Sequence, residues 1–367
     1  MIVYNRIKET KQKQKGMHPI KLSFQVNQLI LVLAVVASSM LVIFLINSRD
    51  LTSQQQYVFA QENTTPSSYN KTSTSTSFPQ IHNYTSSPPG PVNSWIIETE
   101  NAVVVIDTQQ LLSEAKNLLR EVKKIDKPIL GIMITHPHPD HIGGTAVLLK
   151  GTANVPIYST QSVFNIMKTD MGGKIALAKK FHGNDYADQI VLPNRIVNSG
   201  ENVTIDGITY NFEDLGPGEA GDMTLIYLPS QKILFTGDVV NNRMIPFLAE
   251  GRTSDWIKQI EFVRQNYSDA KVLFPGHGES GSPKTLLDLQ SNYIKTFRSL
   301  VEQQVQSAVE VGGESAANIT EDGKTKIKSD LQRLYPKYMP VANLPAMLDL
   351  NDLNIDAVAK EISQGKR

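Results

Sequence analysis

The sequence predicts a mixed α/β (α+β) domain, preceded by a transmembrane helix and a disordered linker. Three observations lead to this prediction. An uncharged apolar run lies near the N-terminus, a segment rich in Ser, Thr, Gln and Asn follows it, and short apolar strands then alternate with amphipathic helices. The chain has 367 residues, of which 40% are hydrophobic and 20% are charged, so it is long enough for one large domain or two ordinary ones.

The charge balance and the absence of cysteine exclude several kinds of site. Lysine and arginine total 36, and aspartate and glutamate also total 36, so the net charge does not indicate a nucleic-acid partner. Because the chain has no cysteine, it has no disulfides, no thiolate metal ligands and no cysteine nucleophile. We therefore expect a small-molecule substrate and no nucleic acid, while the sequence leaves the oligomeric state undetermined.

Residues 29–46 form an apolar run without a charged side chain, and the basic segment 1–28 precedes it. About 20 apolar residues span a bilayer as a helix, so we predict a single-pass signal anchor here. The basic flank favours a cytoplasmic N-terminus, which would place the rest of the chain outside the cytoplasm. A cleaved signal peptide is the alternative, although its apolar region is usually only about 7–15 residues long. The predicted location is a cell membrane.

Residues 47–90 are dominated by Ser, Thr, Gln and Asn and end in a proline-rich stretch. A segment of this composition cannot bury enough apolar surface to offset its ordering entropy, so we predict a disordered linker. We place a catalytic domain at 91–282. The remaining residues, 283–367, are predicted to form a helical extension that packs on this domain.

The first part of the catalytic domain has the pattern of strands followed by a helix and a further strand. Residues 95–99 and 102–107 are apolar enough to form two strands. Residues 111–125 carry leucine, valine and isoleucine at helical spacing, which indicates an amphipathic helix. The apolar run 129–134 predicts a buried strand that leads directly into a histidine-rich loop.

This loop, residues 135–144, reads Thr-His-Pro-His-Pro-Asp-His-Ile-Gly-Gly. Three imidazoles and a carboxylate within six positions are a density of metal ligands that core packing does not require. Both groups suit Zn²⁺ and its first-row neighbours. His136 and His138, two apart on an extended loop, can face one ion, whereas Asp140 and His141 can face a second. The sequence therefore predicts a metal-binding loop, in which the glycine pair lets the backbone turn tightly.

Two later strand ends carry further candidate ligands. Residues 225–229 and 233–236 predict a hairpin, and it leads into Asp238, a carboxylate directly after a glycine that can approach a metal pair. The predicted strand 271–274 runs into His277, which lies between two glycines. A histidine in this position is well placed to reach an ion.

These motifs resemble those of the metallo-β-lactamase superfamily, from about Pro91 to about Ser280. The pattern His-x-His-x-Asp-His followed by Gly-Gly is highly specific for that fold and much less specific for a substrate. The resemblance implies a four-layer αββα sandwich. It also implies that Asp238 bridges two metals and that His277 is a terminal ligand.

One departure from the superfamily concerns the segment before the predicted hairpin. Most members have a histidine ligand there, and this chain has none. Counting back from the hairpin puts Glu219 in its place. Alkylsulfatase-type members carry a glutamate in a Glu-Ala-(x)₂-Met setting, which is similar to residues 219–223, but they also have glutamate where this chain has Asp238. We expect Glu219 to complete the first site, with Asp222 as the fallback; the alternative is an acidic turn beside an incomplete site.

The predicted centre holds two Zn²⁺ ions, with Mn²⁺ or Fe²⁺ as alternatives that an added carboxylate would favour. A metal-bound hydroxide would attack an ester-like substrate, such as a sulfate ester, a carboxylic ester, a lactone or a β-lactam. Asp140 is the candidate catalytic residue, because it can orient the nucleophile and pass on a proton. The first predicted site consists of His136, His138 and Glu219, the second of Asp140, His141 and His277, and Asp238 lies between them.

Five further residues have two interpretations each. Asn241, Asn242 and Arg243 either contact a substrate anion or belong to the plain surface. Asp107, at a strand end, is either an outer partner of the metal centre or an ordinary turn residue. His182 is either an exposed loop residue or an active-site contact. Two other functions also stay open, namely a non-haem iron oxidoreductase or dioxygenase on the same fold and a non-catalytic metal-binding module.

Overall fold

The structure is a computed structural model that describes residues 79–152, 154–310, 319–345 and 348–365. The described residues belong to one compact unit, Thr74–Arg367. Three of the predicted segments lie partly or wholly outside the described residues: the basic segment 1–28, the transmembrane helix 29–46 and the linker as far as residue 78.

The described part of the chain contains no helix that is long and apolar enough to cross a membrane. The longest helix in it, α9 (Pro283–Glu310), has 28 residues and carries lysine, arginine, aspartate and glutamate along its length. A membrane-spanning helix needs about 20 predominantly apolar residues. This finding contradicts the predicted single-pass location in a cell membrane, with the catalytic domain outside the cytoplasm, and we withdraw that prediction.

Two β-sheets form the centre of the unit. The first has six strands in the order β1-β2-β3-β4-β5-β6, and the second has five in the order β12-β10-β9-β8-β7. The strands of the first sheet are β1 (Gln80–Thr85), β2 (Asn93–Glu98), β3 (Val103–Ile106), β4 (Ile129–Met133), β5 (Ile157–Thr160) and β6 (Arg195–Val197). Those of the second sheet are β7 (Asn202–Ile205), β8 (Ile208–Gly216), β9 (Met223–Leu228), β10 (Ile233–Asn241) and β12 (Val272–His277).

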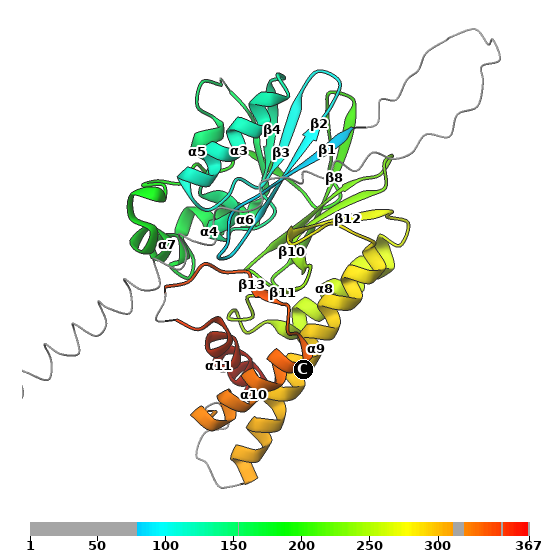
Figure 1. The fold of residues 1–367 in the computed structure, drawn as a ribbon. Helices are drawn as coiled ribbons and strands as arrows, with labels where there is room; N and C mark the ends of the chain where they lie inside the picture. Colours follow the sequence, from blue (N-terminus) through cyan, green and yellow to red (C-terminus); the bar gives the residue numbers. More distant parts are fainter. Residues whose placement is uncertain (1–78, 153, 311–318, 346–347, 366–367) are drawn as a thin grey trace, which may run out of the picture. The chain divides into compact units, whose positions relative to one another are not determined.

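Helices cover the outer face of each sheet. Figure 1 shows α3, α5 and α6 beside the first sheet, and α8 and α9 beside the second. The helices that follow strands of the first sheet are α3 (Leu112–Lys124), α4 (Pro139–Ile142), α5 (Thr145–Leu148), α6 (Gln161–Thr169) and α7 (Lys174–His182). The described helices that come after β10 in the chain are α8 (Thr253–Asn266), α9, α10 (Glu321–Leu334) and α11 (Leu350–Ser363).

Alternation along the strands sorts the apolar side chains into separate layers. On β3, Val103 and Val105 pack in a cluster with Leu118 of α3, whereas Val104 packs in a cluster with Ile226 of β9. Successive side chains of a strand point to opposite faces of the sheet, so one strand contributes to both layers. A third apolar cluster lies between the second sheet and its helices. The structure therefore confirms the mixed α/β sandwich, with helices outside both sheets.

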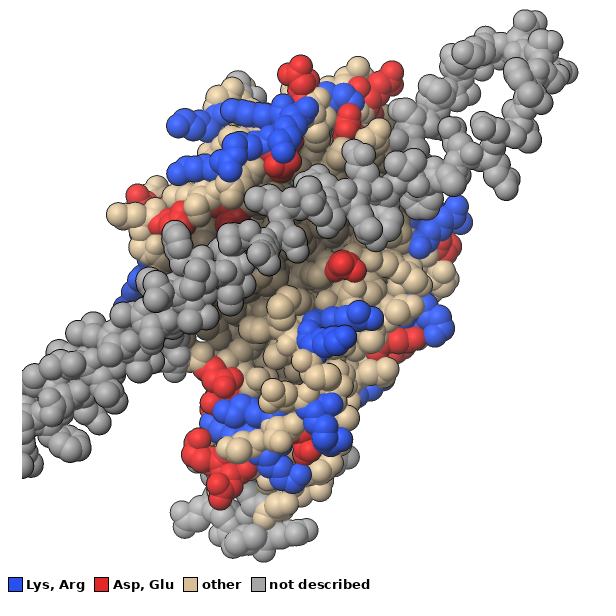
Figure 2. Space-filling view, viewed as in Figure 1, with Lys and Arg blue, Asp and Glu red and all other residues tan. Residues whose placement is uncertain are grey.

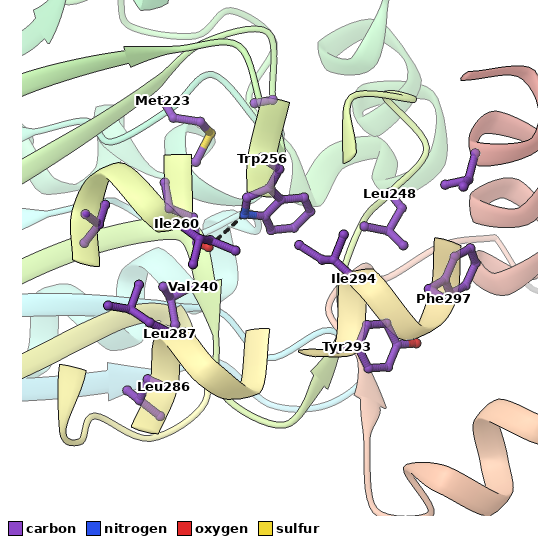
Figure 3. Close-up of a cluster of buried hydrophobic side chains, with 14 of the residues drawn as sticks. Met223, Val240, Leu248, Trp256, Ile260, Leu286, Leu287, Tyr293, Ile294 and Phe297 are labelled. Carbon is purple, nitrogen blue, oxygen red and sulfur yellow. Dashed lines mark hydrogen bonds between the residues drawn. The ribbon is translucent and has the colours of Figure 1, made fainter. Parts of the chain in front are cut away.

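The third apolar layer holds the strand that carries Asp238. Trp256 of α8 is 1% exposed and lies among Ile260, Leu287 and Val240 (Figure 3). Its indole nitrogen donates a hydrogen bond to the carbonyl oxygen of Val239 at 2.8 Å (Figure 3). A buried tryptophan needs a partner for this nitrogen. The bond therefore joins α8 to β10 at the residue that directly follows Asp238.

The end of the predicted linker differs from its expectation. Residues 80–85 form strand β1, which pairs antiparallel with β2 at the edge of the first sheet. The hydroxyl of Tyr84 also donates a hydrogen bond to Glu114 of α3. The composition predicted disorder because this segment has few apolar residues. The segment is ordered because its backbone forms hydrogen bonds with β2, and composition gives no information about such pairing.

Charges of both signs lie on the face drawn in Figure 2, where Lys and Arg are interspersed with Asp and Glu and separated by uncharged surface. This mixture is consistent with the equal totals of 36 basic and 36 acidic residues. The face drawn in Figure 2 is therefore not dominated by one sign of charge, as the basic stripe of a nucleic-acid-binding surface would be.

Candidate metal centre

The candidate ligands meet where several strands end at the same edge. β10 and β12 are parallel, so their C-terminal parts, which carry Asp238 and His277, lie together. β9 is antiparallel to β10, so the residues just before β9, including Glu219, reach the same edge. The histidine-rich loop is joined to β9 by a hydrogen bond of 2.8 Å from the nitrogen of Thr224 to the oxygen of Thr135. Residues far apart in the sequence are thus brought to one place.

Glycine permits the close approach of these segments. A Cβ atom on Gly276 would lie 1.8 Å from Oδ1 of Asp238, and one on Gly144 would lie 2.0 Å from the oxygen of Thr108. Gly143 and Gly144 have φ angles of −61° and −89°, which any residue adopts. The glycine pair of the loop is therefore required for packing against a neighbouring backbone, and not for the tight turn that its sequence suggests.

The first group of candidate ligands consists of His136, His138 and Glu219. Oε2 of Glu219 lies 3.1 Å from Nδ1 of His138 and 3.6 Å from Nε2 of His136. All three residues are buried. Both carboxylate oxygens of Glu219 and Nε2 of His136 lack a hydrogen-bond partner among the described residues. Buried polar atoms are normally satisfied, so this arrangement fits a cation between them.

The second group consists of Asp140, His141 and His277. Oδ2 of Asp140 lies 3.5 Å from Nε2 of His141 and 3.4 Å from Nε2 of His277. Asp238 lies against both imidazoles, with Oδ1 at 3.3 Å from His141 and Oδ2 at 3.1 Å from His277. The rings of His136 and His141 are 4.0 Å apart between centroids, so the two groups are adjacent. The structure thus brings all seven predicted ligands together, and their role as ligands stays a prediction.

Outer partners orient the imidazoles of the second group. Nδ1 of His141 donates a hydrogen bond of 2.7 Å to Oδ2 of Asp107. The same Oδ2 accepts from the hydroxyl of Thr135, and Oδ1 accepts from the nitrogen of Thr135. Nδ1 of His277 donates to the backbone oxygen of Pro91. Such bonds fix the tautomer and point Nε2 towards the site of an ion. Of the two interpretations of Asp107, the structure supports the outer partner.

The charges of the second group determine its protonation when no cation is bound. Burial alone would lower the pKa of His141 and His277, but Asp140 and Asp238 outweigh it. The pKa of His141 is therefore well above its usual range, and that of His277 is raised to about 10. Burial would raise the pKa of Asp140, yet the two imidazoles hold it well below its usual value.

The first group behaves in the opposite way. Burial, together with the nearby His141, pushes the pKa of His136 well below its usual value. Burial also raises the pKa of Glu219, although His138 opposes this shift. A histidine must be neutral to bind a metal, so His136 is already in the form that a ligand requires.

A cavity of about 160 Å³ opens onto the centre, and His138, Asp140, Glu219 and Asp238 form part of its wall. Two other segments supply most of the remaining wall. One is α7, and the other is the C-terminal segment 341–345, which a short parallel pairing of β11 (Met244–Ile245) with β13 (Met339–Pro340) brings to this place. A small molecule in the cavity would therefore lie against the candidate ligands.

Two charged residues close to His138 or in the cavity wall were not found from the sequence. Oε1 of Glu250 lies 3.5 Å from Nε2 of His138, and Lys174 forms an ion pair with the same oxygen. Burial lowers the pKa of Lys174, and Glu219 partly offsets this shift. Lys174 is the only lysine or arginine that the described residues contribute to the cavity wall. Neither residue belongs to a recognisable motif, so only the tertiary structure could find them.

The three predicted substrate-binding residues are not part of this wall. Asn241 is buried, and its backbone nitrogen donates a hydrogen bond of 3.0 Å to Oε1 of Gln290. The side chain of Asn242 donates to the backbone oxygen of Glu279 at 2.8 Å. Arg243 is exposed and has a φ of 58°. β10 continues as far as Asn241 and pairs there with β12, which ties this stretch to the sheet.

The positions of Glu219, Asp222 and His182 bear on the alternatives that the sequence left open for these residues. Glu219 faces the histidines, whereas Asp222 accepts a hydrogen bond of 2.9 Å from the hydroxyl of Thr160. Burial and the nearby Asp214 raise the pKa of Asp222 to about 7. His182 ends α7 and lines the cavity, so it is not the exposed loop residue of one interpretation.

Comparison with known proteins shows a family and several distant relatives. Residues 87–277 match the metallo-beta-lactamase superfamily. A linear primary-alkylsulfatase from Pseudomonas sp. (strain ATCC 19151) is 23% identical over 223 residues, which cover 52% of this chain and 42% of the relative. The metallo-beta-lactamase type 2 of Bacillus cereus is 27% identical over 201 residues, or 54% of this chain and 71% of the relative. A solved metallo-beta-lactamase from Pontibacter korlensis has a TM-score of 0.49 at 23% identity, covering 61% of this chain and 97% of that one.

Proposed function

Because the chain belongs to the metallo-beta-lactamase superfamily, we propose that it is a dinuclear metal-dependent hydrolase that cleaves an ester-like bond of a small molecule. Its relatives, an alkylsulfatase and a β-lactamase, are both hydrolases, although the match covers less than half of the alkylsulfatase. Sulfate esters, carboxylic esters, lactones and β-lactams are the proposed substrate classes. The observation that carries the proposal is the convergence of buried, unpartnered nitrogen and oxygen atoms beside a cavity.

Divalent cations suit this donor set. Imidazole nitrogen and carboxylate oxygen are ligands of Zn²⁺, which is the metal that we propose, with Mn²⁺ and Fe²⁺ as alternatives. When bound, two such ions would lower the pKa of a water molecule towards neutrality and polarise the substrate oxygen. We propose that His136, His138 and Glu219 hold one ion, that Asp140, His141 and His277 hold the other, and that Asp238 lies between them.

The charge of the ligands also bears on the substrate. Asp140, Glu219 and Asp238 supply three negative charges, and Asp107, which accepts a hydrogen bond from His141, supplies a fourth. These four charges would balance the four positive charges of two divalent ions, so the ligand set alone gives no preference for an anionic substrate. A preference of that kind would come from Lys174, the cationic side chain in the described cavity wall.

Asp140 is the proposed proton carrier. Its side chain lines the cavity, while Oδ2 faces the imidazoles of His141 and His277. Because its carboxylate lies in the cavity beside the other candidate ligands, Asp140 can accept a proton from an attacking water molecule. It can then return this proton to the leaving oxygen, since both groups would lie in the same cavity.

Lys174 is proposed to contact the negative charge of the substrate. Its ammonium group lies on the cavity wall and is paired with Glu250, which in turn lies near His138. A substrate oxyanion can add to this ion pair, because a lysine has three donors. Glu250 would then keep both Lys174 and His138 in position.

Hydrolysis assays test this proposal. The full-length protein, loaded with zinc, is assayed on p-nitrophenyl acetate, a p-nitrophenyl sulfate, an acyl lactone and a chromogenic β-lactam. We expect turnover of at least one class and a fall of about 100-fold or more in the Asp140→Asn variant, as for loss of a general base. The matched control is Asp188→Asn, because this aspartate is 91% exposed, is paired with Lys179 and does not line the cavity. No turnover of any class by the zinc-loaded protein would contradict the proposal.

A further inference from the structure

Most of the cavity wall beyond the candidate ligands is made of apolar side chains, and its polar members are Gln110, Lys174, His182 and Asn343. Phe247 joins the two parts of the wall. Its ring lies edge-on to the imidazole of His138, with 5.5 Å between centroids, and Nζ of Lys174 lies 5.8 Å from the same ring centroid. Leu177 and Phe181 of α7 continue the wall away from the charged groups. The cavity therefore changes from polar to apolar within a single space.

Several of these side chains are more exposed than their chemistry predicts. Leu177 is 49% exposed, Phe181 is 40% exposed and Leu348 is 38% exposed, and all three line this cavity. They are three of eight large hydrophobic side chains with this degree of exposure in the described ranges. Apolar side chains that are exposed singly need no explanation, whereas a group of them around one opening marks a binding site.

The C-terminal part of the wall is held in place by contacts outside the cavity. The nitrogen of Val341 donates a hydrogen bond of 3.1 Å to the oxygen of Ile245, next to the pairing of β11 with β13. Gly90, with a φ of 67°, packs so closely that a Cβ atom there would lie 2.6 Å from the nitrogen of Asn343. The segment is thus positioned before any ligand binds, which lowers the entropy cost of binding.

This segment lies outside residues 87–277, which match the superfamily. It is therefore a feature of this chain that the match to the family does not supply. We infer that α7 and the C-terminal segment 341–345 together bind an aliphatic or aromatic group of the substrate, attached to the bond that is cleaved at the metal centre. The inference rests on the proposed function, because it takes the ligand of the cavity to be the substrate.

The substrate is the occupant that the geometry favours, because the apolar wall and the candidate ligands enclose the same cavity. A group that lies against Leu177 and Phe181 is directly connected, through the space beside Phe247, to the charged end near Lys174. Full burial of a methylene group strengthens binding about fourfold. Since this wall is partly open to solvent, we expect about a two- to threefold gain for each methylene.

Binding of alkanesulfonates tests the inference without requiring turnover, because their carbon–sulfur bond is not cleaved by hydrolysis. The zinc-loaded full-length protein is titrated with butane-, hexane-, octane- and decanesulfonate in a calorimeter. The test variant carries Leu177→Ser and Phe181→Ser. The matched control carries Leu334→Ser and Phe262→Ser, because these side chains are 46% and 38% exposed and do not line the cavity. Leu348→Ser tests the C-terminal side separately.

The inference predicts that affinity rises with chain length in the wild type and in the control, and that the rise falls below twofold per methylene in the α7 variant. An equal rise in the α7 variant would overturn it. Absence of binding at every chain length would also overturn it, since the wall would then be covered or unsuited to an apolar group. Chain-length-dependent binding without turnover in the hydrolysis assays would refute the hydrolase and leave the apolar site. Turnover without dependence on chain length would refute the apolar site alone.

Discussion

Each group of candidate ligands takes two members from the histidine-rich loop, but the two groups differ in the hydrogen bonds that support them. In the second group, Nδ1 of His141 donates a hydrogen bond of 2.7 Å to Asp107, and Nδ1 of His277 donates one to the backbone oxygen of Pro91. In the first group, Nε2 of His138 lies 3.5 Å from Oε1 of Glu250, which is longer than a good hydrogen bond. Both imidazoles of the second group thus have a hydrogen-bonded outer partner, whereas in the first group only His136 has one, the hydroxyl of Thr135 at 3.0 Å from its Nδ1.

The electrostatics follow the same division. The pKa of His141 is raised and that of His136 is lowered, although both belong to one loop and their rings are 4.0 Å apart. Asp107, Asp140 and Asp238 surround His141, while burial dominates at His136. The comparison teaches that a compact ligand motif can place its members in opposite environments, because residues from distant strands decide what each imidazole faces.

The largest expected effect comes from removing the support of the second group. Asp107→Ala leaves Nδ1 of His141 and two donors of Thr135 without an acceptor in a buried place. Loss of one partner from a buried charged pair costs about 3–5 kcal/mol, so we expect the free energy of unfolding to fall by that amount. Urea denaturation of the metal-free protein measures this change, and metal analysis should show loss of the second ion.

Asp206→Ala is the matched control for Asp107→Ala. Asp206 also accepts three hydrogen bonds, from Thr99 and from the backbone and side chain of Asn101, but two of these bonds are exposed. We expect a much smaller change in stability and no change in metal content. Equal effects of the two substitutions would show that Asp107 has no special role at the centre.

A smaller effect is expected from filling the space beside Asp238. In the Gly276→Ala variant, the new Cβ atom would lie 1.8 Å from Oδ1 of Asp238, so this carboxylate must move. Overpacking of this kind costs about 1–3 kcal/mol, and we expect metal content to fall as well. In the control, Gly281→Ala, the nearest atom would be 3.6 Å away, so both quantities should stay the same. Unchanged metal binding in Gly276→Ala would contradict the proposed place of Asp238.

The smallest expected effect is a difference in the number of protons that each group releases when it binds zinc. The pKa of His277 is raised to about 10 and that of His141 is also raised, so both hold a proton at pH 7 until a cation displaces it. The affinity of the second group for zinc should therefore increase as the pH rises from 6 towards 10. His136 has a lowered pKa and releases no proton.

Calorimetry in buffers of different ionisation enthalpy measures this difference at pH 7. Glu219→Ala leaves the second group and should release about two protons for each zinc bound. His277→Ala leaves the first group and should release fewer. The same number of protons in both variants would refute the electrostatic difference between the groups.

The sequence predicted most of the polar end of the site. Its candidate ligands lie on a dense loop motif and next to glycines at strand ends, and these are local patterns that bring side chains to one edge of a sheet. Glu219 was found by its distance from the hairpin, and the structure places it 3.1 Å from His138. The αββα arrangement was predicted from the resemblance to the metallo-β-lactamase superfamily. The alternation of side chains between the two faces of each strand explains its layers.

The ion pair of Lys174 with Glu250 and the apolar wall of the cavity could not be predicted in this way. Lys174, Phe247 and Glu250 come from a helix and a loop without a motif, and segment 341–345 reaches the cavity only through the pairing of β11 with β13. The expectation for Asn241 relied on β10 ending earlier than it does, at the close of the hairpin pattern. Local patterns predict which residues can bind a metal, while the shape of the cavity depends on contacts between distant segments.

The most direct test of the dinuclear centre is the metal content of the full-length protein beside the Glu219→Ala variant, measured by mass spectrometry after zinc loading and dialysis. Glu121→Ala is the control, because this glutamate lies on the surface of α3, paired with Lys124. We predict about two equivalents in the wild type and the control, and about one equivalent in Glu219→Ala. One equivalent in all three proteins would contradict a dinuclear centre that includes Glu219.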